Sequence, residues 1–364
     1  MEAVKIGILG CGGIARSKHL PELQKIEGVE IIGFYDPIKS RAQECAEKFG
    51  NHAKVYETAG ELLADPGIDA VHICTPNNTH AELAVQALEN HKHVMCEKPM
   101  AINGEQAYQM EQAAQKSGKI LTVGYQSRFE RRSLYLKRLC GQGELGEIYY
   151  GKAHAVRRRG VPTWGSFLNS DIQGGGCLID MGTHALDLTL WLMDNYEPEY
   201  AVCNIYHKLG KNQNAANVWG PWNPEKFLVE DSAFGFIRMK NGATVEIDCS
   251  WALNIRNAKE SVATLCGTKA GADMLEGLTL NGEKEQSLYV NHIDVTNTTG
   301  ISLDIPYSDN PNQMETEDWI QAIRTGREPL VKFHEAAVVC RIIDGMYPVS
   351  YTHLRAHETD QYLV

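Results

Sequence analysis

The sequence predicts two α/β domains in series, a doubly wound parallel sheet followed by an α+β domain on a largely antiparallel open sheet. Strand-like and helix-like stretches alternate as far as Gly124, which is typical of a parallel sheet. Beyond Gly124 alternating apolar stretches dominate, and Lys240-Asn241-Gly242 separates two of them as a hairpin turn would. A chain of 364 residues can form two cores, so we expect domains at 1–124 and 125–347.

The overall composition limits the possible partners and the compartment. A formal net charge of -11 argues against a nucleic-acid or anionic-membrane partner. The ten cysteines show no closely paired metal-ligand spacing, and several lie in apolar runs, which favours a reducing compartment. A strand pattern begins almost at Met1, so no signal peptide is expected, and no apolar run reaches the length of a membrane span. We therefore expect a cytoplasmic protein.

Apolar runs and capping residues set the elements expected in the first half. Ser40 and Asn103 are residue types that cap helices, and Thr58 with Glu61 has the spacing of a capping box. The expected strands are 4–9, 29–35, 70–74, 93–96 and 120–124, and helices are expected between them.

The second half is expected to contain more strands than helices. A loop rich in Asn, Trp and Pro spans 210–227. The expected strands are 148–156, 201–208, 231–239, 244–251, 260–266 and 287–295, and the expected helices are 130–139, 177–188, 314–324 and 334–347.

The first strand runs into Gly10-Cys11-Gly12-Gly13-Ile14-Ala15, a G-x-G-x-x-G/A arrangement in a strand–turn–helix context. Gly10 allows the tight turn, and Gly12 lets the backbone approach a pyrophosphate. Ala15 lets the helix pack closely on the strand, and the phosphates would rest on amides at the helix start. The first domain is therefore predicted to be a Rossmann dinucleotide-binding domain.

The second strand ends in Asp36, about twenty residues past the glycines. Its carboxylate can accept hydrogen bonds from a ribose diol and would repel a 2′-phosphate, which favours NAD. Lys39 and Arg41 could accommodate that phosphate, so NADP remains possible. The alternative role for Asp36 is that of a turn residue before Pro37.

Two further turns are expected at the same edge of the sheet. Thr75-Pro76-Asn77-Asn78-Thr79-His80 follows a strand and can line the cofactor, or it is an ordinary turn with Thr79 as a helix cap. Glu97-Lys98-Pro99 follows the buried run 93–96, at the strand end where ligands collect in open α/β sheets. The alternative is a solvated Lys98 paired with Glu97.

One segment of the second half carries candidate chemistry. Gly174-Gly175-Gly176 precedes a helix on which Asp180 and His184, four residues apart, share one face. The glycines would allow close approach of backbone to a ligand. The alternative is a helix-surface pair. No third ligand at helical spacing is visible, so no metal site is predicted.

Three other features allow more than one interpretation. Arg157-Arg158-Arg159 could bind an anion or form a solvated face. Trp164 and Phe167 could form a sugar-stacking wall or serve the core. His154, in an expected strand, is more typical of a structural than of a catalytic role.

Taken together, these motifs closely resemble the glucose–fructose oxidoreductase / inositol dehydrogenase / rhizopine-catabolism (Gfo/Idh/MocA) family over about Lys5 to Met346. The motifs are G-C-G-G-I-A at 10–15, Asp36, C-T-P-N-N-T-H at 74–80, E-K-P at 97–99, G-Y-Q-S-R-F at 124–129 and G-G-G-x-x-x-D-x-G-x-H at 174–184.

The resemblance implies that Lys98, Asp180 and His184 are the catalytic residues of a homodimer or homotetramer formed through the second sheet. It fixes no substrate, since relatives act on inositols, aldoses, sugar nucleotides, glycosides and anhydrosugars. We expect the cofactor to contact Gly10, Gly12, Gly13, Ile14, Ala15, Asp36, Arg41, Thr75, Pro76, Asn77, His80, Glu97, Lys98 and Gln126, and the substrate to contact Lys98, Arg128, Arg159, Trp164, Asp180 and His184.

The expected reaction is hydride transfer between a secondary alcohol of a sugar, glycoside or inositol and a nicotinamide. His184 would be the base, because an ordinary imidazole titrates near operating pH. Lys98 would stabilise the developing negative charge on the same oxygen, and Asp180 would orient the substrate. The alternatives are an NAD-dependent glycoside hydrolase that oxidises transiently, and a non-catalytic dinucleotide-binding sensor.

The end of the chain does not fit this resemblance. Residues 348–364 resemble translated adapter read-through, so we expect them to be a non-native tail.

Overall fold

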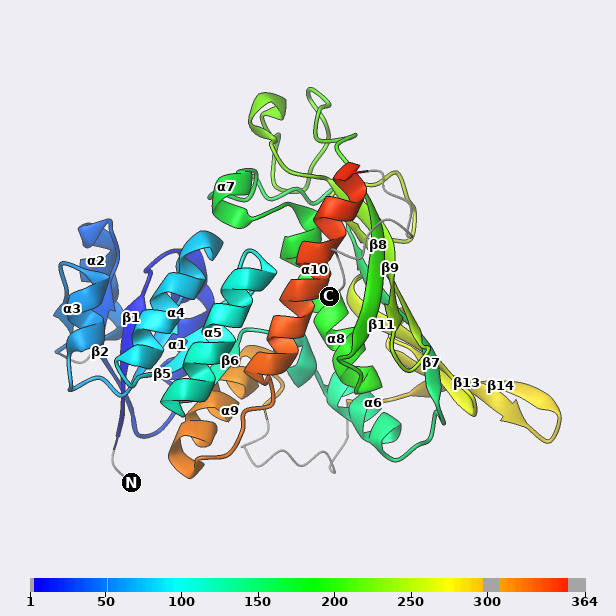
Figure 1. Ribbon diagram of the computed structural model, residues 1–364, viewed down its shortest axis with the longest axis horizontal. Coiled ribbons are helices and arrows are strands. Elements are labelled where there is room, and N and C mark those ends of the chain that lie inside the picture. The colour runs from blue at the N-terminus through cyan, green and yellow to red at the C-terminus, as the bar shows by residue number, and fades with distance from the viewer. Residues whose placement is uncertain (1–2, 51, 297–307, 353–364) are drawn as a thin grey trace. The chain divides into compact units, whose positions relative to one another are not determined.

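The computed structural model describes residues 3–50, 52–296 and 308–352, which form two compact units (Figure 1). Within these limits the first unit holds 3–101, 105–129 and 308–337, and the second holds 102–104, 130–296 and 338–352. The domain boundaries expected at 124 and 347 stay predictions, and the structure adds that 308–337 lie with the first unit. No described helix combines the length and the apolar character needed to cross a bilayer.

Six parallel strands form the sheet of the first unit: β1 (Val4–Leu9), β2 (Val29–Tyr35), β3 (Lys54–Val55), β4 (Ala70–Ile73), β5 (His93–Cys96) and β6 (Leu121–Val123). Their order is β3-β2-β1-β4-β5-β6, and each neighbouring pair is parallel. The chain order reverses between β1 and β4, and open α/β sheets bind ligands at such a point. The predicted doubly wound sheet is confirmed.

A helix from the far end of the chain completes the core of this unit. Trp319 and Ile320 of α9 (Pro311–Thr325) are fully buried in the same cluster as Ile6 and Phe34. The helix packs against η1 (Ala15–His19, π-helical) and α1 (Leu20–Leu23), and it is orange in Figure 1. The other helices are α2 (Lys39–Phe49), α3 (Ala59–Ala64), η2 (Asn77–Thr79), α4 (His80–Glu89), α5 (Gly104–Ser117) and η3 (Gln126–Phe129).

The capping residues behave partly as expected. Thr58 caps α3, since its side chain accepts a hydrogen bond from the Glu61 N–H. The Glu61 carboxylate accepts from Glu57, one residue before the position that a capping box requires. Ser40 was expected to cap α2, but that helix begins at Lys39. Its N-cap residue is Ile38, which makes no side-chain capping hydrogen bond.

Eight strands form the sheet of the second unit: β7 (Ile148–Val156), β8 (Pro198–Tyr206), β9 (Ser232–Met239), β10 (Thr244–Ser250), β11 (Glu260–Gly267), β12 (Ala270–Asp273), β13 (Leu278–Lys284) and β14 (Ser287–Ile293). Their order is β14-β13-β12-β11-β7-β10-β9-β8. Only the β7–β10 pair is parallel, so the largely antiparallel sheet is confirmed. The β9–β10 hairpin turns at Gly242, whose φ is 92°. The sequence patterns of β12 and β13 are too short and too polar to predict strands.

One face of this sheet is covered and the other is open. Helix α8 (Thr183–Met193) packs against β7 and β11 (Figure 1). Ala153, Ala155 and Ile247 are buried, whereas the alternate residues His154 and Asp248 face the open side. The remaining elements are α6 (Arg131–Gly141), α7 (Ser170–Gln173), η4 (Leu178–Gly182, π-helical), η5 (Pro224–Lys226) and α10 (Phe333–Thr352).

Helix α10 bears on the tail expected at 348–364. It passes through Pro348 and ends at Thr352, beyond the expected end at Tyr347. Residues 353–364 lie outside the described residues, so the non-native tail stays a prediction.

Candidate active site

The glycine loop follows β1 at the strand end where the sheet order reverses. Gly10 has a φ of 90°, and a Cβ there would lie 2.7 Å from the Cys74 carbonyl oxygen, so the fold itself requires glycine. Around Gly12 and Gly13, by contrast, a Cβ would meet no described atom within 4 Å. Ile14 is 43% exposed and Ala15 is fully buried. The loop therefore offers open backbone to a pyrophosphate, as a dinucleotide requires.

Asp36 follows β2 and touches this loop. Its Oδ2 accepts a hydrogen bond from the Cys11 N–H at 2.8 Å, and its Oδ1 accepts one from the Ile38 N–H at 2.8 Å. Each carboxylate oxygen keeps a second lone pair, which a ribose hydroxyl could use. Arg41 follows a few residues later in the sequence and is exposed to solvent. Lys39 forms an ion pair with Glu57.

The turn after β4 is held by a buried histidine. Both ring nitrogens of His80 face carbonyl oxygens, Nδ1 that of Pro99 at 2.8 Å and Nε2 that of Thr75 at 2.9 Å. Burial lowers the pKa of His80. His80 thus supports the turn from the interior, while Pro76 is exposed and Asn77 is half-buried.

A buried ion-pair network fixes the Glu97-Lys98-Pro99 turn. Glu97 Oε1 accepts from Lys18 Nζ at 3.1 Å and contacts His19 Nε2 at 2.6 Å, while Oε2 accepts from the Lys98 N–H at 3.0 Å. Burial alone would raise the pKa of Glu97, but Lys18 and His19 hold that pKa well below its usual value. The carboxylate is therefore ionised, and the Lys98 side chain is half-buried rather than fully solvated.

Lys18 also contacts Glu315 Oε2 at 2.9 Å and Gln126 Oε1 at 3.0 Å. Burial disfavours its charge, but Glu315 and Glu97 raise the pKa of Lys18 above its ordinary value. Sequence reasoning missed Lys18, His19 and Glu315, because nothing in their local pattern distinguishes them from other helix residues.

A group of metal-ligating residue types lies next to this network. The ligand atoms of His19, His72 and Cys74 are within 4.8 Å of one another and are buried. The His72 ring lies 4.0 Å from that of His19 and 5.5 Å from that of Trp319. Burial keeps the pKa of His72 well below its ordinary value. Among the described residues, no such group includes Asp180 or His184.

Asp180 and His184 lie where the π-helical turn η4 joins α8 in the second unit. Asp180 is 9% exposed, and its Oδ2 accepts a hydrogen bond from Trp251 Nε1 at 2.9 Å. His184 is half-buried in the first turn of α8. π-Helical turns inside helices are frequent at functional sites.

A second buried carboxylate fixes the start of this helix. Glu230 Oε2 accepts from the Gly176 N–H at 2.8 Å, and Oε1 accepts from the Leu178 N–H at 2.9 Å and the Tyr347 hydroxyl at 3.0 Å. A Cβ on Gly175 would collide with Tyr347, and one on Gly176 would collide with Glu230. The expectation that these glycines make room for a ligand is therefore corrected, since protein atoms fill that space.

The other predicted substrate residues have different surroundings. Arg128 is fully buried, and its Nη1 pairs with Glu335 at 2.5 Å. Arg159 donates to Asn254 Oδ1 at 2.6 Å. Trp164, in contrast, is 51% exposed.

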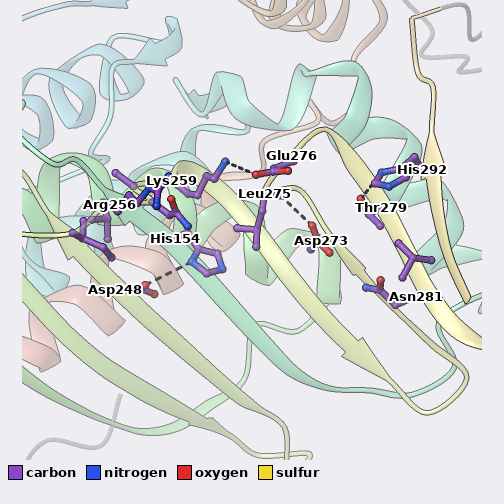
Figure 2. Close-up of a pocket in the computed structure, with 15 residues that line it drawn as sticks. His154, Asp248, Arg256, Lys259, Asp273, Leu275, Glu276, Thr279, Asn281 and His292 are labelled. Carbon is purple, nitrogen blue, oxygen red and sulfur yellow. Dashed lines mark hydrogen bonds and ion pairs between the residues drawn. The ribbon is translucent and has the colours of Figure 1, made fainter. Parts of the chain in front are cut away.

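The open face of the second sheet carries a cavity of about 670 Å³ that the sequence did not predict (Figure 2). His154 lies in it, with Nδ1 3.6 Å from Asp248 and Nε2 3.1 Å from Thr264. Because β7 residues alternate between the two faces, this cavity lies on the opposite face from α8. It is therefore separate from Asp180 and His184.

Comparisons with known proteins agree with this geometry. Residues 4–125 match the oxidoreductase family with an NAD-binding Rossmann fold, and residues 133–273 match the GFO/IDH/MocA C-terminal domain. D-glucoside 3-dehydrogenase of Escherichia coli is 38% identical over 74% of this chain and 77% of its own. The scyllo-inositol 2-dehydrogenase (NAD(+)) of Bacillus subtilis is 27% identical over 92% of this chain and 90% of its own. The structure of a levoglucosan dehydrogenase with NADH and levoglucosan superposes with a TM-score of 0.80 at 20% identity, covering 97% of this chain and 98% of that one.

The doubly wound sheet and its open glycine loop define a dinucleotide-binding α/β protein. With both halves matched, the chain belongs to the Gfo/Idh/MocA family of oxidoreductases, and its first unit is an NAD-binding Rossmann domain. The family resemblance and the NAD cofactor expected from the sequence are confirmed. Lys98 belongs to the first unit and Asp180 and His184 to the second.

The two kinds of glycine in the loop predict different mutant behaviour. Gly10→Ala should lower the melting temperature by several degrees, because a positive φ costs about 1–2 kcal/mol and the Cβ meets the Cys74 carbonyl. Gly12→Ala should leave the melting temperature unchanged but weaken NAD binding, measured by titration. Equal melting temperatures for both variants would contradict this assignment.

The buried carboxyl group of Glu315 should make the stability of the protein depend on pH. Burial raises the pKa of Glu315 to about 7 from 4.5, so the folded chain holds this proton more tightly than the unfolded chain. Its contribution to stability is complete below pH 4.5 and is lost as pH rises to about 7. Glu315→Gln removes this titration, so its melting temperature relative to the parent should rise by several degrees between about pH 5 and about pH 8. Glu105→Gln, at an exposed site, is the control, and a pH-independent difference for Glu315→Gln would contradict the prediction.

Proposed function

We propose that this protein is an NAD-dependent dehydrogenase that oxidises a secondary alcohol of a sugar, glycoside or inositol, or catalyses the reverse reduction. The observation that carries the proposal is the position of Lys98. Its turn follows β5 at the sheet edge that also holds the glycine loop, since the Glu97 N–H bonds to Ile73 and the Cys74 N–H bonds to Leu9. A lysine on that turn lies at the binding edge of the fold.

Bound NAD supplies a nicotinamide that can accept or return a hydride. His184 takes the proton of the reacting hydroxyl, as an imidazole can near neutral pH. Lys98 donates a hydrogen bond to the same oxygen and stabilises the negative charge that develops on it. Asp180, whose second oxygen is held by Trp251, binds a neighbouring hydroxyl and orients the ring. Arg128 takes no part in this proposal, because Glu335 already pairs with it in the interior.

The substrate class rests on the relatives. Their names specify a D-glucoside and scyllo-inositol, which share a six-membered ring with several hydroxyl groups. A single reacting hydroxyl among several equivalent ones needs a fixed neighbour for orientation. The buried position of Asp180 supports that role.

The surface of the second unit supports a homodimer or homotetramer formed through its open sheet face. Tyr200, Tyr206 and Phe236 are each 38% exposed on the neighbouring strands β8 and β9. Apolar groups gathered on one face favour burial in an interface. The ten cysteines are all free, which supports a reducing, cytoplasmic location.

Variants of the proposed acid–base residues test the mechanism. Lys98→Ala and His184→Ala should each lower kcat by about 10²–10⁴-fold, while NAD affinity should stay within about threefold of the parent. Lys116→Ala and His334→Ala, at exposed sites, are the controls. Turnover is measured as NADH formed from inositols, glucose and glucosides. Near-normal turnover in both variants would refute these roles, and sugar release without net NADH would indicate a glycoside hydrolase instead.

Asp36 should determine the choice between NAD and NADP. Asp36→Asn keeps the shape but removes the charge that repels a 2′-phosphate, so kcat/KM for NADP relative to NAD should rise about tenfold or more. Glu30→Gln, exposed on β2, is the control. An unchanged preference would show that Asp36 does not face the ribose.

A further inference from the structure

A second cavity of about 470 Å³ lies between two loops of the second unit, 163–169 and 221–228. The loops are joined by the Leu228 N–H, which donates to the Leu168 carbonyl at 3.1 Å. Just before the second loop, the Trp219 carbonyl accepts a hydrogen bond from the Thr163 hydroxyl at 2.8 Å. The cavity is therefore built by defined contacts. Its polar lining includes Ser166, Asn169, Asn223, Glu225 and Lys226.

The wall of this cavity contains an indole that remains open to solvent. Trp164 is 51% exposed and packs edge to face against Trp219, which is 43% exposed, with ring centroids 4.9 Å apart. The Arg157 guanidinium lies 5.0 Å from the centre of the Trp219 ring. The Asn217 amide clamps the same loop to Val161, with hydrogen bonds of 2.9 Å in both directions. These contacts hold the Trp164 ring in place before any ligand binds.

This combination suits a particular chemistry. A pyranose ring has an apolar C–H face that can lie on an indole and a rim of hydroxyl groups that need donors and acceptors. The cavity offers both, an aromatic wall and a few convergent polar groups, as small-molecule sites do. Glu225 and Lys226 bring opposite charges, so the lining does not select an anion or a cation.

Packed aromatic rings connect this cavity with Asp180, a proposed catalytic residue of the same unit. Trp251, which donates to Asp180, lies 6.5 Å from the Phe167 ring, and Phe167 lies 5.9 Å from Trp164. Trp251 is fully buried and Phe167 is half-buried, so Trp164 is the exposed end of this row of rings, on the side of the cavity. A single sugar ring at Asp180 would leave the exposed Trp164 ring without a ligand.

We propose that this cavity binds a second sugar residue, so that the protein acts on disaccharides or longer glycosides whose reacting ring lies at Asp180. The second ring would stack on Trp164 and bond to the polar lining. This inference rests on the proposed dehydrogenase function for the position of the first ring. Binding of a sugar in the cavity does not itself require the dehydrogenase chemistry.

Cellobiose and methyl β-glucoside are the probes, because they share the reacting ring and differ in the second residue. Their dissociation constants are measured by calorimetry on the full chain with NAD, and kcat/KM is measured alongside. We expect Trp164→Ala to raise the dissociation constant of cellobiose about tenfold or more. The dissociation constant of methyl β-glucoside should rise less than twofold. Trp164→Phe should lose less affinity for cellobiose than Trp164→Ala does. Tyr108→Ala removes another half-exposed aromatic ring, on α5, and should change neither constant.

The outcomes separate this inference from the proposed function. Selective loss of cellobiose binding without turnover of any sugar would support the site and refute the dehydrogenase. If sugars are oxidised but Trp164→Ala weakens both probes equally, or weakens neither, the second-sugar site would be refuted. The proposed dehydrogenase function would then still stand. A phenyl glucoside that depends on Trp164 while cellobiose does not would also overturn it. If Trp164→Ala does not fold, Glu225→Ala and Trp164→Phe are tested in its place, again by comparing the affinities for cellobiose and methyl β-glucoside.

Discussion

One buried carboxylate, Glu97, joins the turn that carries Lys98 to the helix that follows the glycine loop of the first unit. Lys18 and His19, in the helix after the glycine loop, contact one of its oxygens, and the backbone of Lys98 donates to the other. An ion buried without partners costs several kcal/mol, so the carboxylate can stay inside only while these groups stay in place. The turn that carries Lys98 is thereby fixed to the helix that begins at the cofactor loop.

In the second unit, too, a buried carboxylate fixes the segment that carries the candidate residues. Glu230 is buried and accepts backbone N–H groups from both sides of the turn into η4, as well as the Tyr347 hydroxyl. Burial raises the pKa of Glu230, and these hydrogen bonds oppose the rise. Asp180 and His184 follow directly on this fixed start, and Trp251 holds Asp180 from the sheet side. Both groups of candidate residues are therefore held in place by a buried carboxylate.

The second sheet separates two kinds of surface. The face covered by α8 is apolar, and the helical segment on it carries Asp180 in η4 and His184 in α8. The open face carries the charged cavity around His154 and Asp248 (Figure 2). It also carries exposed aromatic rings. Substrate chemistry and self-association can thus use different faces.

The sequence by itself determined the features that are local. Gly10, Asp36 and the hairpin at Gly242 were predictable because turn geometry and hydrophobic period act over a few residues. The longer strands of both sheets followed from the same patterns, whereas β3, β12 and β13 did not. Only the tertiary structure decided which distant groups meet. Lys18 and Glu97 are 79 positions apart, Glu315 lies on a helix from the far end of the chain, and the glycines at 174–176 proved to face protein atoms. Partners in a buried polar network carry no shared local signal, because burial and charge pairing are set by packing across the whole unit.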